Sequence, residues 1–294
     1  MEMRTDLLQN ESDVQKMKEL MADLPDGPTL VDFEEVISLS SVRGRTRLWR
    51  EKDKLTGFAF VDDYNNLQFE ILPQYRTAWM EDEIIRWGIE CVQKRNRESG
   101  QQNTLDASFR LKDKWQIGML MRHGFRKEAV RTLHYERDLE MAIPECPLAE
   151  GYRLRKAAGE AEVEELVALH RAAFGTENMS VEWRLAIMRA PDYEPELDYV
   201  IVAPNGEMAA FCICGFESED GSVGYTDPIG THPRCQRQGL GKAIVTAGME
   251  ALKARGAKRV RLGTSSTNHG MRKLAESLGF VVASESIWFS RQVP

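Results

Sequence analysis

Residues 231–242 read Thr-His-Pro-Arg-Cys-Gln-Arg-Gln-Gly-Leu-Gly-Lys, and they lie between a predicted strand, Val223 to Thr231, and a predicted helix, Gly241 to Arg255. Gly239 and Gly241 allow a tight turn in which the backbone approaches a ligand without a Cβ in the way. The amide groups of this turn would then point outward at the positive end of the helix. The segment is therefore expected to bind a phosphate or a pyrophosphate.

Two common phosphate-binding motifs do not fit this segment. A Walker loop needs Gly-x-x-x-x-Gly-Lys-Ser/Thr, and the residues here do not match it. A dinucleotide fold would open with Gly-x-Gly-x-x-Gly, whereas only Gly239 and Gly241 are present.

The surrounding residues resemble a different family. Gln-x-x-Gly-x-Gly at Gln236–Gly241, preceded by Gly230-Thr-His-Pro, resembles the acetyl-CoA pyrophosphate loop of the GNAT superfamily of N-acyltransferases. Downstream, Asn268 and the run Arg272-Lys-Leu-x-x-x-Leu-Gly-Phe280 resemble the next block of that family. The resemblance covers residues 151–294. The tandem arrangement described below looks like the double-GNAT proteins of the mycothiol synthase type.

This resemblance implies acetyl-CoA as acyl donor and an amine as acceptor, with no metal. Backbone groups at the end of the strand would bind the pantetheine arm, the amides of the loop would bind the pyrophosphate, and Asn268 would contact the cofactor from the far side. The expected cofactor-binding residues are Ile229, Gly230, Thr231, Gln236, Arg237, Gln238, Gly239, Leu240, Gly241, Lys242 and Asn268.

Catalysis of this kind needs a neutral amine, a donor for the oxyanion and a proton for the departing thiolate. Asp227, just before Pro228, is the predicted general base acting through water; its alternative role is to hold a turn at a strand end. A backbone N–H near Ile229–Thr231 is the simplest oxyanion donor. The family usually carries a tyrosine where this chain has Ala275, so the proton must come from another group, from water or from no group at all. Tyr225, named with Asp227 as a candidate catalytic residue, Ser265, His269 and Cys235 are the possible donors.

Strands and helices alternate along both halves of the chain, which predicts a mixed α/β sheet. The segment 144–151 holds two prolines and a glycine and is the expected linker. Pro73 matches Pro233, and Gly124-Phe125 matches Gly279-Phe280, which indicates an internal duplication. We therefore expect two tandem GNAT-like domains, 1–145 and 150–294, each with a mostly antiparallel central sheet flanked by helices.

The first copy has lost the features of the loop. Trp79 stands where Gly239 would be, and Glu81 stands where Gly241 would be. The indole blocks close approach of the backbone, and the carboxylate repels a pyrophosphate, so this half should not bind CoA. Its expected role is a scaffold, with a wall of the acceptor pocket as the alternative.

Composition excludes several other classes of protein. The net charge of −7 argues against a general nucleic-acid binder, and no apolar run approaches the length needed to span a membrane. Five cysteines without a Cys-x-x-Cys pair, and no evident secretory signal, predict a cytoplasmic protein. The acid-rich stretch 160–220 favours a cationic small-molecule acceptor, although it is equally readable as a solvated face. A monomer or a homodimer is expected.

The leading hypothesis is direct transfer of an acyl group, by default acetyl, from CoA to an amine in a ternary complex, with catalysis in the second domain. The alternative is a non-catalytic protein that binds or senses acyl-CoA, and Ala275 is the feature that supports it. A purely structural protein is disfavoured, because Gln236, Gly239, Gly241 and Asn268 are retained together.

Overall fold

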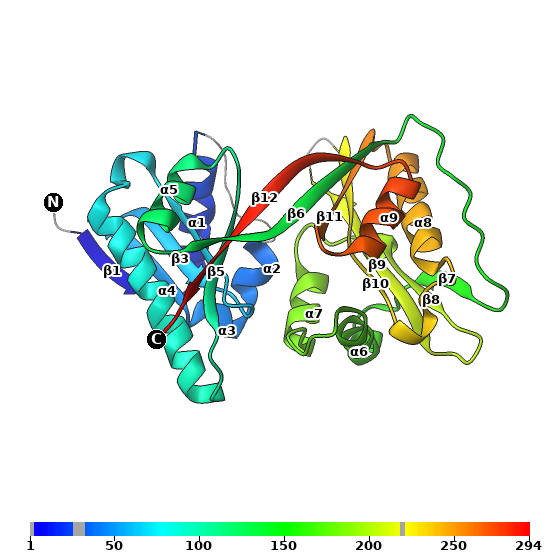
Figure 1. Cartoon of the computed structure of the whole chain (residues 1–294), viewed down its shortest axis with the longest axis horizontal. Helices are drawn as coiled ribbons and strands as arrows, with labels where there is room; N and C mark the ends of the chain where they lie inside the picture. Colours follow the sequence, from blue (N-terminus) through cyan, green and yellow to red (C-terminus); the bar gives the residue numbers. More distant parts are fainter. Residues whose placement is uncertain (1–2, 26–32, 218–220) are drawn as a thin grey trace. The chain divides into compact units, whose positions relative to one another are not determined.

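A computed structural model describes residues 3–25, 33–217 and 221–294 (Figure 1). The chain forms two compact units, one of Met1–Val130 together with Ser286–Pro294, and one of Arg131–Glu285. The strands form a four-stranded antiparallel sheet and an eight-stranded mixed, mostly antiparallel sheet, both with helices packed against them, which confirms the predicted mixed α/β fold class. Two long strands, β6 (Arg126–Asp138) and β12 (Val281–Gln292), contribute residues to both units (Figure 1).

The first unit pairs its early strands in the order β1-β2-β3-β4, and β5 pairs with β12. Its core lies between these strands and the long helix α4, whose apolar side chains recur at helical spacing. The elements are β1 (Met3–Leu7), α1 (Glu11–Ala22), α2 (Phe33–Ser38), α3 (Ser40–Arg43), β2 (Thr46–Glu51), β3 (Lys54–Val61), β4 (Leu67–Ile71), a 3-10 turn (Pro73–Tyr75), α4 (Ala78–Ser99), β5 (Thr104–Arg110) and α5 (Lys114–Arg122).

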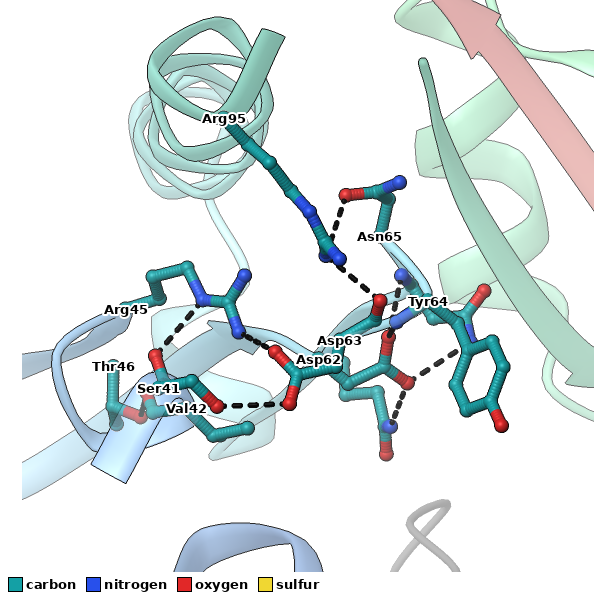
Figure 2. Close-up of polar contacts among 11 residues, drawn as sticks. Ser41, Val42, Arg45, Thr46, Asp62, Asp63, Tyr64, Asn65 and Arg95 are labelled. Carbon is teal, nitrogen blue, oxygen red and sulfur yellow. Dashed lines mark hydrogen bonds and ion pairs between the residues drawn. The ribbon is translucent and has the colours of Figure 1, made fainter. Parts of the chain in front are cut away.

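The hairpin between β3 and β4 is closed by its own polar side chains (Figure 2). The Asp62 carboxylate accepts from the backbone N–H groups of Tyr64 and Asn66, at 2.8 and 2.9 Å. Its burial raises the pKa of Asp62, and these hydrogen bonds oppose that rise. Asp63 pairs with Arg45, and Arg95 donates to the Asp63 carbonyl at 2.7 Å. This acidic turn is therefore a structural element of the first unit.

The second unit has the strand order β6-β11-β10-β9-β8-β7. Helices α8 and α9 share one hydrophobic core with the sheet, and α6 packs with β8 and β9 in a separate cluster. The elements are β7 (Arg153–Lys156), a 3-10 turn (Gly159–Glu162), α6 (Val163–Phe174), α7 (Val181–Arg189), a 3-10 turn (Pro195–Leu197), β8 (Asp198–Val202), β9 (Met208–Phe216), β10 (Val223–Thr231), a 3-10 turn (Pro233–Cys235), α8 (Leu240–Ala254), β11 (Arg259–Ser265) and α9 (His269–Ser277).

The last strand of each sequence half pairs with a strand of the other half, within one eight-stranded sheet. β11 pairs along Arg259–Ser265 with residues Thr132–Asp138 of β6, which the first half encodes. β5 pairs along Thr104–Arg110 with residues Ser286–Gln292 of β12. The sequence predicts a pair of strands from Val281 onward, whereas the structure has one continuous strand. The duplication boundary near residues 145–150 stays a prediction, because the compact units describe packing and not ancestry.

Three further sequence expectations concern membrane spans, cysteines and metal ligands. Within the described ranges, no helix combines the length and the apolar character that crossing a membrane requires. Cys212 and Cys214 are buried on one face of β9 with their sulfurs 3.5 Å apart, as small core residues do. The described residues contain no group of three or more His, Cys, Asp or Glu arranged to hold a metal ion.

Candidate active site in the second unit

Strands β10 and β11 separate part-way along their length. They pair in parallel only from Val223 to Tyr225 on β10, whereas β10 remains paired with β9 as far as Thr231. The register of β10 against β9 shifts between Thr226 and Ile229, a bulge that bends the strand. The Asp227–Pro228 peptide bond, which is cis, lies in this bulge. We call the space between the separated ends of β10 and β11 the strand opening.

Asp227 lies at the point where the two strands part. Its Oδ2 accepts a hydrogen bond from the backbone N–H of Gly263 on β11 at 3.1 Å. The carboxylate thus accepts from β11 just beyond the last backbone pair of β10 and β11, and the Asp227 residue is exposed. This contact is the strand-end role that the sequence leaves open, and it also places the predicted base at the strand opening.

The backbone beyond Asp227 offers hydrogen-bonding groups to the opening. The His232 N–H donates to Ala209 of β9, so by alternation Gly230 also faces β9, whereas Ile229 and Thr231 face away from it. In agreement, the Thr231 carbonyl accepts from the Gln236 side chain at 3.3 Å. The N–H groups of Ile229 and Thr231 therefore point toward the space between β10 and β11.

The loop that follows is shaped by left-handed backbone. Arg237 has φ of 66° and Gly239 has φ of 79°, and a side chain at φ above zero costs about 1–2 kcal/mol. Gly239 is the residue before α8, and no side chain caps the helix there. The first turn of α8 also contains no acidic residue. Its amide groups and its positive dipole end are therefore available to an anion.

The side chains around the loop leave the positive charge of its cations without an ion-pair partner among the described residues. Within the described residues, Arg234, Arg237 and Lys242 form no ion pair. The Gln238 Oε1 accepts from the Tyr152 hydroxyl at 2.9 Å, which ties the loop to the segment before β7. The site thus keeps cationic side chains next to an uncapped helix, as a pyrophosphate site requires.

Helix α9 lies against the start of α8. A Cβ added at Gly241 would come 2.7 Å from Cδ1 of Leu274, so glycine lets the two helices approach closely. Asn268 caps α9, because its Oδ1 accepts from the Met271 N–H at 3.1 Å. Ala275 is fully buried in the core that α8 and α9 share. The position at which the family resemblance leads us to expect a tyrosine thus holds a buried methyl group here.

The helix of the first unit that corresponds to α8 is α4, and the first turn of α4 is capped. α4 begins at Ala78, and the Thr77 side chain caps it by accepting from the Met80 N–H. Glu81 lies in its first turn, is 7% exposed and is paired with Arg122 at 2.6 Å. Trp79 is 46% exposed at the position that aligns with Gly239. A side-chain cap and a buried carboxylate thus occupy the helix end that remains open in the second unit.

Comparison with known proteins follows the same division of the chain. Residues 163–280 match the family described as Acetyltransferase (GNAT) family. The predicted resemblance to GNAT acetyltransferases is therefore confirmed. The matched residues lie in the second unit and contain the strand opening, the loop and the α8–α9 contact.

Sequence relatives and solved structures agree with this result. A mycothiol acetyltransferase of Salinispora arenicola is 31% identical over 175 residues, which are 57% of this chain and 57% of that protein. One of Thermobispora bispora is 28% identical over 176 residues, 57% of this chain and 60% of that protein. The chain thus spans less than two thirds of these relatives' length.

Similarity in fold extends over both units. A GCN5-related N-acetyltransferase from Sphaerobacter thermophilus has a TM-score of 0.67 at 18% identity, covering 99% of this chain and 96% of that one. A tandem GNAT protein from the clavulanic acid biosynthesis pathway has a TM-score of 0.67 at 14% identity, covering 100% and 99%. At these identities the comparison shows the tandem GNAT fold.

A small cavity between the sheet of the second unit and helices α6 and α7 was not found from the sequence. Its lining residues are Leu166, His170, Met179, Arg184, Ile187, Phe211, Ile213 and Pro228. Burial, followed by the charges of Arg184 and Arg171, lowers the pKa of His170 to about 4. His170 is thus a neutral imidazole, stacked on Phe174 at 4.5 Å, and its buried Nδ1 has no partner in the described residues. In the sequence it sits among apolar residues at helical spacing, which predicts only a core position.

The buried polar group next to this cavity was also missed. Arg184 is paired with Asp198, whose carboxylate also accepts from the Tyr193 hydroxyl at 2.6 Å. Burial raises the pKa of Asp198, although the pairing with Arg184 opposes this. Sequence spacing gives no signal for such a triad, since its members come from α7, a loop and β8.

The other candidate proton donors are placed apart. A Cβ at Gly215 of β9 would lie 2.5 Å from the Tyr225 hydroxyl, so the Tyr225 ring extends over β9 and away from the strand opening. The Ser265 hydroxyl is hydrogen-bonded to Thr267 at 2.8 Å, and His269 is exposed at the start of α9. The structure therefore brings Asp227, Ile229 and Thr231 together at the opening and does not bring the Tyr225 hydroxyl there.

Much of the acid-rich stretch 160–220 forms ion pairs within the second unit. Glu160 pairs with Arg189 at 2.8 Å, Glu194 with Arg255 at 2.8 Å and Glu217 with Arg261 at 2.7 Å. A paired carboxylate attracts a cationic ligand less than a free one does. These contacts support the solvated-face interpretation for part of the stretch.

Proposed function

We propose that the protein is an acyl-CoA-dependent N-acyltransferase that transfers an acyl group, by default acetyl, directly to a small-molecule amine in a ternary complex. Catalysis is assigned to the second unit. The observation that carries the proposal is the open start of α8, with its cations and left-handed loop, next to the strand opening. The GNAT match over residues 163–280 supports it.

Binding of acetyl-CoA follows from the groups at this opening. The loop amides between Arg237 and Lys242 bind the pyrophosphate, and Arg234 adds positive charge next to it. The backbone groups of Ile229 and Thr231 bind the pantetheine arm as an added strand would be bound, since no strand pairs with them on that side. The thioester is thereby brought to the bulge at Asp227.

Transfer then uses the groups at the bulge. Asp227, through a water molecule, accepts a proton from the ammonium form of the acceptor, and the neutral amine attacks the thioester carbon. The C–N bond forms as the carbonyl oxygen takes up negative charge, which the Ile229 N–H stabilises. Pro228 has no N–H, so Ile229 is the first residue after Asp227 that can donate. The nitrogen of this intermediate then loses a proton, collapse breaks the C–S bond to give the amide, and the departing CoA thiolate gains a proton.

The acceptor is proposed to be a small molecule. The relatives named mycothiol acetyltransferase support that class. The internal ion pairs of the acid-rich stretch reduce the case for a strongly cationic acceptor.

A screen of primary amines tests the proposal. Glucosamine, cysteamine, lysine and spermidine are each incubated with acetyl-CoA and the full chain, and acetylated product is measured by mass spectrometry. We expect at least one product whose formation is lost in Asp227→Asn. Product formed equally by wild type and by the variant would contradict the assigned base.

A second candidate function is a non-catalytic protein that binds or senses acyl-CoA. The full burial of Ala275, where the family resemblance leads us to expect a tyrosine, favours it, because a methyl group cannot protonate the thiolate. Saturable acetyl-CoA binding without turnover against a broad amine panel would support this function. Turnover would exclude it.

A further inference from the structure

The strand that the first half contributes to the catalytic sheet carries a histidine next to the strand opening. We propose that His134 of β6 is the proton carrier of the transfer reaction, taking a proton from the attacking amine and giving it to the departing CoA thiolate. This inference rests on the proposed function and deepens it. It assigns the step for which Ala275 leaves the chain without the usual tyrosine.

The register of the sheet places His134 directly opposite Gly263. β6 and β11 are antiparallel, and Gly263 pairs with His134. Because the Gly263 N–H donates to Asp227, it does not point toward β6. Gly263 and His134 therefore form a non-hydrogen-bonded pair, in which the two Cα atoms lie about 4.5 Å apart and side chains approach most closely.

The alternation of β6 puts the His134 side chain on the face away from α8 and α9. Leu133 and Tyr135 are buried in the core that α8 and α9 share, so His134 and Glu136 point to the opposite face. In agreement, Glu136 pairs with Arg261 of β11 at 2.8 Å on that face. His134 is partly exposed there.

Asp227 reaches the same place from the other side of β11. A Cβ built on Gly263 would lie 3.2 Å from the Asp227 Oδ2, and this Cβ direction belongs to the face that carries Arg261 and His134. Asp227, Gly263 and His134 thus form a row across β10, β11 and β6. Because Gly263 has no side chain, the row has a gap one side chain wide between a carboxylate and an imidazole.

The chemistry of the transfer suits one imidazole used twice. An amine that has attacked the thioester must lose a proton from nitrogen, and the CoA thiolate must gain one. Neutral His134 accepts the first proton, becomes an imidazolium and returns that proton to sulfur as the C–S bond breaks. Net, an amine and a thioester give an amide and a thiol, and the histidine is unchanged.

Several charged groups of the second unit surround this position. Asp227 is on β10, Arg261 is on β11, and Glu136 is two residues along β6 and paired with Arg261. Glu285 is at the end of the part of β12 that belongs to this unit, and β12 neighbours β6 in the sheet. Glu136 is already paired with Arg261. Asp227 is therefore the carboxylate that lies in the same row as His134.

Nuclear magnetic resonance tests the placement without an acceptor. The imidazole signals are assigned with His134→Gln and titrated in wild type and in Asp227→Asn, and CoA is then added to each. We expect the pKa of His134 to fall when the carboxylate is neutralised, because a nearby negative charge favours the imidazolium. We also expect CoA to shift the His134 signal, while His123 of the first unit stays unchanged.

Each outcome of this experiment has a separate meaning. A His134 pKa that is the same in both proteins, with CoA moving only the signal of His232 beside the loop, would overturn the role of His134 and leave the proposed function intact. Failure of CoA to bind at all, measured by calorimetry, would overturn the proposed function itself.

Kinetics with an amine identified by the screen tests the proton transfer. His134→Gln is expected to lower kcat at least tenfold with little change in the KM for acetyl-CoA, and to remove one limb of the kcat–pH profile. Glu136→Gln, on the same strand and face, is the matched control and should stay within about twofold of wild type. Equal kcat and an unchanged profile in His134→Gln would refute the proposal.

Discussion

The Asp227 carboxylate accepts a hydrogen bond from the Gly263 N–H at 3.1 Å and so joins β10 to β11 where their ladder ends. The residue proposed as general base therefore also holds the two walls of the strand opening at a fixed separation. An ordered carboxylate at the edge of the opening favours catalysis, since its position does not have to be established when substrates bind. Position and proton transfer can be tested separately.

Replacement of Asp227 by Asn should separate the two roles. The amide oxygen of Asn can still accept from the Gly263 N–H, but it cannot take up a proton. We expect kcat/KM for the identified amine to fall about 10²–10⁴-fold, while acetyl-CoA affinity changes little. Asp227→Ala, which also removes the link to β11, should in addition lower the urea midpoint of unfolding. Equal activity in wild type and Asp227→Asn would leave the carboxylate with only its structural role.

The contact between Gly241 and Leu274 predicts a coupling between α8 and α9. Gly241→Ala places a Cβ 2.7 Å from the Leu274 Cδ1, so it should cost about 1–3 kcal/mol of stability and weaken acetyl-CoA binding. In a Leu274→Val background the same change should cost less, because the clashing atom is gone. A double-mutant cycle by urea unfolding and calorimetry measures this difference. Additive effects would show that the two side chains do not limit the approach of the helices.

The lowered pKa of His170 predicts a pH dependence of stability. Its value of about 4 lies below the ordinary 6.5, so between these pH values the unfolded chain binds a proton that the folded chain does not. The free energy of unfolding should therefore fall as pH falls from 6.5 to 4. His170→Phe keeps the ring next to Phe174 and should reduce this slope by up to about 1.4 kcal/mol per pH unit. Denaturant unfolding at several pH values provides the slopes, and identical slopes would contradict a buried neutral imidazole.

The sequence predicts the second unit better than the first. The strand Val223–Thr231 has the predicted bounds, and the helix predicted over Gly241–Arg255 lies at Leu240–Ala254. The left-handed backbone at Gly239 was also predictable, because glycine adopts positive φ without the steric cost that a Cβ brings. The loss of this loop in the first half was predictable from the aligned positions, which hold Trp79 and Glu81 in place of the two glycines.

Long-range features could not be predicted from local sequence. Neither the exchange of β6 and β12 nor the row of Asp227, Gly263 and His134 has a spacing signal, because each depends on which strands pair. The Arg184–Asp198 pair was hidden for the same reason, and the sequence gives Arg184 no distinction from a surface cation. The placement of the Tyr225 ring over Gly215 is likewise a property of the strand register.

The most direct test is calorimetric titration of acetyl-CoA into wild type, Gly239→Trp and Gly256→Trp. Gly239→Trp copies the residue of the first unit. Gly256→Trp is the control, because Gly256 is also a left-handed glycine with open space around it and lies just beyond the other end of the same helix. We predict one-to-one binding by wild type and by Gly256→Trp, and no binding by Gly239→Trp. Absence of binding to wild type, or binding that survives Gly239→Trp, would contradict a single acyl-CoA site at the start of α8.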